Sequence, residues 1–219
     1  MPPSNIRKSG KRRAGRGRTY LLGTLVLIIV IAIGWYVYAS TQSVNSNGPP
    51  TGIVYAKLNT SKGVIDVELY QSKTPKTVTN FVNLAKSGFY DNLVWHRCAK
   101  GFVIQTGDPN TRNGGGDRNH WGEGGSSQTV PLEIDSSLHN LDGYLGMAYA
   151  QDPNGATSQF YINLGDHTSL DGSYAVFGKV TSGMDVARSI GNLPVDSPDH
   201  NQPLDPLPFL TSVTISNIP

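Results

Sequence analysis

The feature that most limits the possible folds is a series of short apolar runs separated by turn residues. In the run 64–70, Ile65, Val67 and Leu69 alternate with polar residues, as in a strand that buries one face. Similar strand-like runs are predicted over residues 53–59, 94–99, 102–106, 128–134, 144–150, 158–164, 175–180 and 211–216. Asn-Gly and Asp-Gly pairs mark several turns between them. The chain is therefore predicted to be mainly β.

Two helices are expected among these strands. The first follows Thr74, a suitable N-cap, has Pro75 at its first position and stops before Gly88. Apolar residues recur along it at helical spacing: Val78, Phe81, Val82 and Ala85. A shorter helix is expected over residues 183–190, and residues 194–208 form a proline-rich loop. Eight or so short strands with two helices predict a closed antiparallel barrel capped by the two helices.

An uncharged apolar stretch over residues 20–39 precedes the strands. About 20 helical residues span the roughly 30 Å hydrocarbon core of a membrane, and aromatic residues stand at both ends of this stretch. A cleavable signal peptide is the alternative, because residues 37–39 resemble a cleavage site. Signal peptides have apolar regions of only about 7–15 residues, so we expect an uncleaved transmembrane helix.

The charge distribution gives the orientation of that helix. Seven of the 18 basic residues and none of the 16 acidic residues precede residue 20, which leaves 11 basic against 16 acidic residues in the rest. The basic character therefore belongs to the tail, and no nucleic-acid partner is expected. Such a tail keeps the N-terminus in the cytoplasm. We expect a single-pass cell-membrane protein whose folded domain lies outside the cytoplasm, or a secreted protein if the signal is cleaved.

Four parts are predicted along the chain. Residues 1–19 form a basic cytoplasmic tail, residues 20–39 a transmembrane helix in contact with membrane lipid, residues 40–52 a flexible polar linker, and residues 53–219 the folded domain. The sequence does not reveal the oligomeric state, and we expect a monomer.

The common catalytic motifs are missing from the sequence. It contains no G-x-S-x-G, no H-E-x-x-H and no phosphate-binding loop. Cys98 is the single cysteine, which excludes an intramolecular disulfide and a cysteine-based zinc site. The five histidines lack the spacing of metal ligands. No metal and no cofactor are predicted.

Five segments instead resemble the cyclophilin-type peptidyl-prolyl cis/trans isomerases. They read VWHR at 94–97, GFVIQTGDP at 101–109, GMAYA at 146–150, SQFYI at 158–162, and LDG with VFGKV between 170 and 180. Their order and spacing match the family, and the resemblance covers about residues 53–218. The short connection over residues 151–154 is more similar to compact prokaryotic members.

The resemblance implies an eight-stranded barrel and an enzyme that binds proline-containing polypeptides in an outer groove. It makes Arg97 the catalytic arginine and Gln105 its polar neighbour. It places these residues around the proline ring: Phe102, Val103, Met147, Tyr161 and Leu170, with Tyr174 at the edge. It assigns contacts with the peptide backbone to Ala148, Tyr149 and Gln159.

Physical chemistry gives Arg97 a plausible task. A peptide bond resists rotation by about 18–20 kcal/mol because the nitrogen lone pair is delocalised. Catalysis of this rotation requires no bond to be made or broken, only stabilisation of the twisted amide. A guanidinium is always charged and has several donors that can reach the prolyl nitrogen or carbonyl. Stabilisation that exists only in the transition state raises turnover.

Simpler interpretations stand beside these. An arginine on a strand is usually a solvated charge, Phe102, Met147 and Leu170 could belong to the core, and His96 suits a structural role because isomerisation needs no proton transfer. A membrane-tethered module that binds proline peptides, or a chaperone, with little catalysis is the alternative function.

Several positions depart from the family pattern. Ser169 stands where many eukaryotic members have tryptophan, so weak cyclosporin binding is expected. The other departures are Tyr174 for a common histidine, Tyr161 for phenylalanine, Lys100 for proline and Thr106 for glycine. None removes the arginine, so we expect activity.

Overall fold

The computed structural model describes residues 52–149, 152 and 155–216. Within these residues, no helix combines the length and the apolar character needed to cross a membrane. The predicted tail and transmembrane helix, and all but the last residue of the predicted linker, lie outside the described residues.

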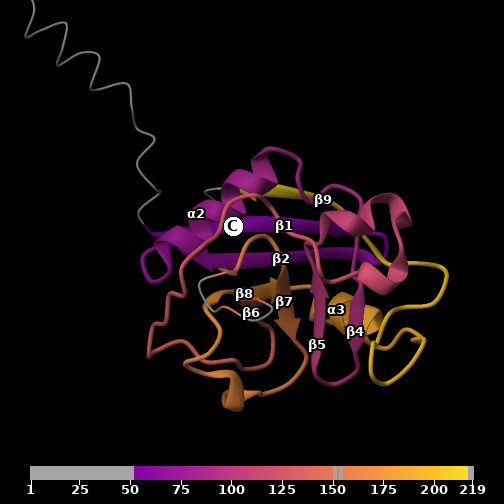
Figure 1. The fold of residues 1–219 in the computed structure, drawn as a ribbon. Coiled ribbons are helices and arrows are strands. Elements are labelled where there is room, and N and C mark those ends of the chain that lie inside the picture. The colour runs from indigo at the N-terminus through magenta and orange to yellow at the C-terminus, as the bar shows by residue number, and fades with distance from the viewer. Residues whose placement is uncertain (1–51, 150–151, 153–154, 217–219) are drawn as a thin grey trace, which may run out of the picture. The chain divides into compact units, whose positions relative to one another are not determined.

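The described strands form one antiparallel sheet that curls on itself (Figure 1). The strands are β1 Ile53–Thr60, β2 Gly63–Tyr70, β3 Leu93–Val94, β4 Arg97–Ala99, β5 Val103–Thr106, β6 Tyr144–Met147, β7 Phe160–Asn163, β8 Val176–Ser182 and β9 Phe209–Ser216. Their order across the sheet is β3-β9-β1-β2-β8-β6-β7-β5-β4. The two outermost strands, β3 and β4, are separated in the chain only by Trp95 and His96. The two ends of the sheet are therefore joined by a short piece of backbone, which explains the curl.

The prediction of a mainly β chain is confirmed, but the predicted closed eight-stranded barrel needs correction. Nine strands are present in the described part of the chain, and their pairing runs from one end of the sheet to the other without closing. The predicted strand 94–99 is broken at Trp95 and His96. The Trp95 N–H donates to the carbonyl of Pro208 (2.9 Å), whereas the Cys98 N–H donates to the carbonyl of Asn201 (2.8 Å).

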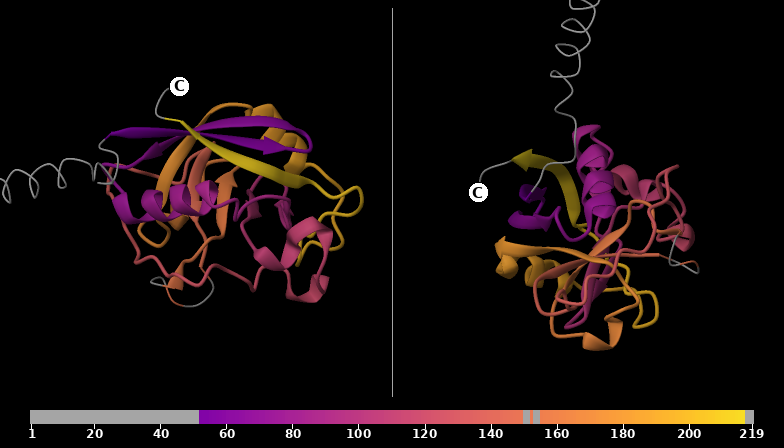
Figure 2. Two further views of the ribbon diagram at one scale, coloured as in Figure 1. Left: turned by 90° about the horizontal axis from the view of Figure 1, so that it is seen from above. Right: turned by 90° about the vertical axis from the view of Figure 1, so that its left-hand side faces the viewer.

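Two α-helices lie against the sheet (Figure 2). Helix α2, Pro75–Lys86, contacts β9 and β2, and helix α3, Met184–Gly191, contacts β2, β4 and β5. Phe81 of α2 packs against Phe160 and Phe177 of the sheet, with ring centroids 5.3 and 5.6 Å apart. These fully buried rings join the helix to the main core, which the alternating inward residues of β1 and β2 complete. The loops of the described part of the chain contain three short 3-10 helices, none of them predicted: Pro109–Gly114, Arg118–His120 and Thr168–Leu170.

The predicted strand 128–134 is wrong. Only Val130 in this segment makes a β-bridge, with Ala156. The segment instead runs past the start of α2, where the carboxylate of Glu133 accepts hydrogen bonds from Lys76 N (3.2 Å), Thr77 N (2.8 Å) and the Thr77 hydroxyl (2.8 Å). The hydroxyl of Thr74 makes no capping bond, so the side chain of Glu133 caps the N-terminus of α2 in place of Thr74. A negative charge is also favourable at a helix N-terminus.

We expect Glu133→Ala to lower the free energy of unfolding by about 1–2 kcal/mol, because two backbone donors of α2 lose their acceptor. Urea denaturation followed by circular dichroism measures this loss. Glu123→Ala is the matched control, since that exposed carboxylate contacts the side chain of His120 and accepts from no backbone N–H of the described residues. Equal stability of the two variants would contradict the assigned capping role.

Candidate active site

A groove with a volume of about 270 Å³ lies beside β4, β5 and β7. Nine of the predicted site residues line it: Arg97, Phe102, Val103, Gln105, Ala148, Tyr149, Tyr161, Leu170 and Tyr174. The other lining residues are His96, Trp121, Gly122, His200 and Gln202. The structure therefore brings together predicted site residues that are up to 77 positions apart in the sequence.

An apolar cluster separate from the main core forms one side of the groove. It consists of buried Ala99, Val103 and Tyr161 with half-buried Phe102, Ala148, Leu170 and Tyr174. A Cβ atom on Gly146 would lie 2.2 Å from the ring of Tyr161, so only glycine leaves room for this ring. The Tyr161 hydroxyl donates to Asn140 Oδ1 (2.7 Å), which satisfies its one polar atom. The cluster can hold a small apolar ring and exclude water from one side of it.

Arg97 extends over this cluster from β4. Its guanidinium carbon lies 5.5 Å from the centre of the Phe102 ring. The register of β4 and β5 places Arg97 opposite Gln105, and Arg97 Nη1 donates to Gln105 Oε1 at 3.5 Å. Burial lowers the pKa of Arg97, but an arginine remains charged throughout the physiological range. A positive charge therefore faces the groove.

Gln159 holds Gln105 from the other side. Its Oε1 accepts from Gln105 Nε2 (2.9 Å), and its Nε2 donates to the carbonyls of Gly122 (2.8 Å) and Gly124 (2.7 Å). A hydrogen-bonded chain thus runs from the 122–124 loop through both glutamines to Arg97. Such a chain restricts the rotamers of each member.

Two predicted substrate-binding residues do not line this groove. Met147 is 2% exposed and belongs to the main core. Gln159 lines a neighbouring compartment of about 240 Å³, which shares Gln105, Gly122, Ala148 and Tyr149 with the groove. The groove and this side compartment are therefore adjacent.

His96 is buried between the groove and the interior. Burial lowers the pKa of His96 to about 4. The Asp108 carboxylate opposes this shift, and the positive charge of Arg97 adds to it. The imidazole is therefore neutral at neutral pH. Asp108 accepts from Gly122 N (2.5 Å) and so fixes the backbone that passes over the imidazole.

Sequence reasoning missed Trp121, Gly122, His200 and Gln202. Trp121 is 6% exposed, and its indole N–H donates to the carbonyl of Gly115 (3.0 Å). A tryptophan within a glycine-rich segment was the one available signal. Nothing in the sequence pattern placed His200 and Gln202, which come from the proline-rich loop before β9.

The arrangement suits binding and polarisation rather than bond cleavage. The residues that line the groove include no aspartate, glutamate, serine or cysteine. Cys98 is buried, and burial raises the pKa of its thiol to about 12, so a nucleophilic thiolate is not available. Within the described residues, no group of three or more histidine, cysteine, aspartate or glutamate side chains could hold a metal ion.

Comparison with known proteins gives consistent matches. The family model described as cyclophilin type peptidyl-prolyl cis-trans isomerase/CLD matches residues 55–214. A peptidyl-prolyl cis-trans isomerase of Schizosaccharomyces pombe is 41% identical over 160 residues, which cover 73% of this chain and 97% of that protein. One from Acinetobacter baylyi is 36% identical over 169 residues, covering 74% and 85%. Since eukaryotic and bacterial relatives both match, the comparisons do not single out prokaryotic members.

Solved structures agree in fold. The crystal structure of a Cryptosporidium parvum cyclophilin type peptidyl-prolyl cis-trans isomerase has a TM-score of 0.67 and 32% identity, and the match covers 76% of this chain and 99% of that one. A structure of the same protein in the presence of the dipeptide Ala-Pro has a TM-score of 0.66.

We expect His96 to make the folded state sensitive to acid. Its pKa falls from 6.5 to about 4 on folding, so the unfolded chain binds this proton first as the pH decreases. The contribution to stability is complete above pH 6.5, and the free energy of unfolding drops by about 3 kcal/mol between pH 6.5 and 4. Denaturation of His96→Gln across that window should lack this drop. The exposed-histidine variant His200→Gln should retain it, and a drop of equal size in both variants would refute the assignment.

Proposed function

This chain belongs to the cyclophilin-type peptidyl-prolyl cis-trans isomerases, and on that premise we propose that Arg97 stabilises the twisted prolyl amide of proteins that fold outside the cytoplasm. The isomerase activity follows from the family match. The role of Arg97, the substrates and the location are the proposed parts.

One observation carries the proposed mechanism: the guanidinium of Arg97 lies beside an apolar cluster in the same groove. When a prolyl amide twists, the nitrogen lone pair is no longer delocalised, and the nitrogen becomes a hydrogen-bond acceptor. An N–H of Arg97 that reaches this nitrogen stabilises the twisted state more than the planar ground states. The interaction therefore lowers the barrier rather than merely strengthening binding.

The surrounding residues prepare Arg97 for this task. Gln105 and Gln159 restrict where the guanidinium can lie, so little reorganisation is required as the amide twists. The half-buried setting of Arg97 keeps water from competing for its donors, which strengthens the interaction. No proton moves in this mechanism, which accords with a neutral, buried His96.

The apolar cluster is the proposed position of the proline ring. The related C. parvum protein has been solved in the presence of Ala-Pro, which supports a proline-containing ligand for this chain too. Phe102, Val103, Tyr161 and Leu170 would contact the ring, and Ala148 and Tyr149 would contact the peptide backbone at the boundary with the side compartment. Met147 would act through the core beneath them.

We expect Arg97→Ala to lower kcat/KM for a short Xaa-Pro peptide by about 10²-fold, the typical effect of removing one transition-state donor. Arg97→Lys keeps the charge but loses the planar fork, so it should recover only part of the rate. Isomer exchange followed by NMR measures the rate, and circular dichroism confirms folding. A folded Arg97→Ala variant with the wild-type rate would exclude the mechanism. Peptide binding by the wild type at the uncatalysed rate would favour a binding module instead.

The proposed location rests on the first 39 residues. The basic tail and the apolar stretch 20–39 together favour a single-pass anchor with a cytoplasmic N-terminus, which would hold the domain near proteins emerging from the membrane. Secretion after cleavage near residue 39 is the alternative. Either topology places the groove outside the cytoplasm.

Protease treatment of intact cells that express the full-length chain with an N-terminal tag tests this topology. We expect the folded domain to be accessible to protease and the tag to be protected, with both in the membrane fraction. Recovery of an untagged domain in the medium would favour cleavage, and protection of the domain would overturn the extracytoplasmic location.

A further inference from the structure

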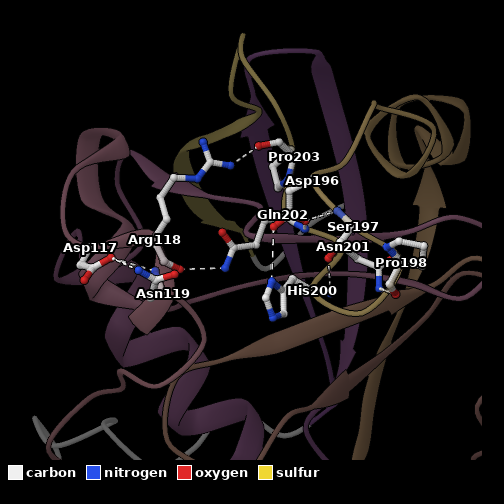
Figure 3. Close-up of polar contacts among 10 residues, drawn as sticks. All are labelled: Asp117, Arg118, Asn119, Asp196, Ser197, Pro198, His200, Asn201, Gln202 and Pro203. Atoms are coloured by element: carbon white, nitrogen blue, oxygen red, sulfur yellow. Dashed lines mark hydrogen bonds and ion pairs between the residues drawn. The ribbon is translucent and has the colours of Figure 1, made fainter.

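The lining of the groove is held in place by polar contacts that lie behind it. Figure 3 shows these contacts for the proline-rich loop before β9, where Gln202 Nε2 donates to the carbonyl of Arg118 (2.8 Å). The Arg118 guanidinium donates in turn to the carbonyl of Pro203. The apolar cluster has no polar side-chain atoms except the hydroxyls of Tyr161 and Tyr174. Its position must therefore be fixed through its backbone and these hydroxyls.

Asn140 is the polar partner of this cluster. It lies in the loop before β6, is fully buried and does not line the groove. Its Oδ1 accepts from the Tyr161 hydroxyl (2.7 Å) and, at a longer distance, from Asn163 Nδ2 (3.3 Å). Burial raises the pKa of Tyr161, so the hydroxyl keeps its proton and remains a donor. The Tyr161 side chain is thus held at both ends, by the backbone of β7 and by its hydroxyl.

Asp171 determines which way the Asn140 amide points. Its Oδ1 accepts from Asn140 N (2.8 Å) and from Asn140 Nδ2 (3.1 Å). Desolvation opposes the ionisation of Asp171, but these hydrogen bonds and one from His139 lower its pKa, so it is a carboxylate at neutral pH. A carboxylate only accepts hydrogen bonds, so it pairs with the NH₂ group of the amide and leaves Oδ1 for the Tyr161 hydroxyl. The chain from Tyr161 through Asn140 to Asp171 therefore donates in one direction.

The backbone of Asn140 is connected to two further members of the cluster. Its carbonyl accepts from His167 N (2.7 Å), and His167 Nε2 donates to the carbonyl of Phe102 (3.0 Å). The imidazole also packs edge-on against the Phe102 ring, with ring centroids 4.7 Å apart. Leu170 N donates to the carbonyl of His167 (2.9 Å). Two groove-lining members of the cluster are thus attached to Asn140 in addition to the tyrosine.

The size of the space for a proline ring depends on where the Tyr161 ring lies. That ring stands nearly perpendicular to the Tyr174 ring, with centroids 6.0 Å apart. Phenylalanine is common at this position in the family, so the hydroxyl is an addition in this chain. A ring held by its hydroxyl cannot tilt to enlarge the space, whereas a ring without this bond can. One extra methylene in an apolar pocket of fixed shape changes kcat/KM by about 10–200-fold.

We propose that Asn140 is a positioning residue that fixes the Tyr161 ring through its hydroxyl and thereby fits the groove to the five-membered ring of proline. This inference rests on the proposed placement of proline on the apolar cluster. Asn140 does not line the groove and acts through the cluster alone. It therefore determines how well the ring fits, whereas Arg97 acts on the charge of the twisted amide.

The test uses the full-length protein and two capped peptides, Ala-Ala-Pro-Ala and its analogue with pipecolic acid, whose ring has one more methylene. After correction for the uncatalysed rates, we expect kcat/KM of the wild type to favour proline by at least about tenfold. Tyr161→Phe and Asn140→Ala should each reduce this preference by about threefold, and the double variant should reduce it no further. For the prolyl peptide the loss should appear in KM and not in kcat, since the planar and twisted states present the same ring.

Tyr90→Phe is the matched control, because it also removes a buried hydroxyl, one that donates to the carbonyl of Ser158 (3.2 Å) within the main core. It should leave the preference unchanged. A folded Tyr161→Phe variant with the wild-type preference would overturn the proposal, even if Asn140→Ala does not fold. Additive losses in the double variant, an equal loss in Tyr90→Phe, or a wild type without preference would overturn it too. Uncatalysed rates for the prolyl peptide would instead overturn the proposed function itself.

Discussion

The hydrogen-bonded chain from Gln159 through Gln105 to Arg97 is the interaction on which the site depends. A half-buried guanidinium is costly unless its donors have partners, and flexible arginine side chains lose entropy when they are fixed. Pairing of β4 with β5 places Gln105 opposite Arg97, and Gln159 then fixes the orientation of the Gln105 amide. Gln159 also donates hydrogen bonds to the 122–124 loop. The one side chain therefore helps to position both the guanidinium of Arg97, through Gln105, and a loop that lines the groove.

The curl of the sheet makes this arrangement possible. The interruption at Trp95 and His96 divides one strand-like segment into β3 and β4. These two short strands form the opposite ends of the sheet. The second piece, β4, then has one edge paired with β5. Its other edge is partly covered by the proline-rich loop before β9, where the Asn201 carbonyl accepts from Cys98 N. The backbone of β4 that carries Arg97 is therefore hydrogen-bonded on both edges. Arg97 itself lies between the apolar cluster and the proline-rich loop before β9. The proposed substrate-binding cluster and the proposed charge-stabilising group therefore lie on the same scaffold.

The sequence was informative where a local pattern determines the structure. The mainly β fold class and most of the groove lining could be predicted from the alternation in β2, the proline and glycine around α2, and five family-like segments. The predicted closed barrel was wrong, because the sheet stays open. Segment 128–134 has the same alternation but finds no strand partner, and Glu133 is used at the start of α2 instead. Met147 lies in the main core, whereas its neighbour Ala148 lines the groove, and both residues are apolar, so the sequence pattern did not distinguish them. The position of the proline-rich loop before β9 could not be predicted. Its attachment to β4 joins Cys98 and Asn201, 103 positions apart, by a backbone hydrogen bond that carries no sequence signal.

The central claim is that Gln105 acts on catalysis by holding Arg97, and a double-mutant cycle on kcat/KM tests it most directly. The cycle compares Gln105→Leu in the wild type with Gln105→Leu in the Arg97→Ala variant. We predict a loss of about tenfold in the first background, corresponding to roughly 1.4 kcal/mol, and no further loss in the second. Equal losses in both backgrounds would show that Gln105 acts independently of Arg97 and would contradict the account.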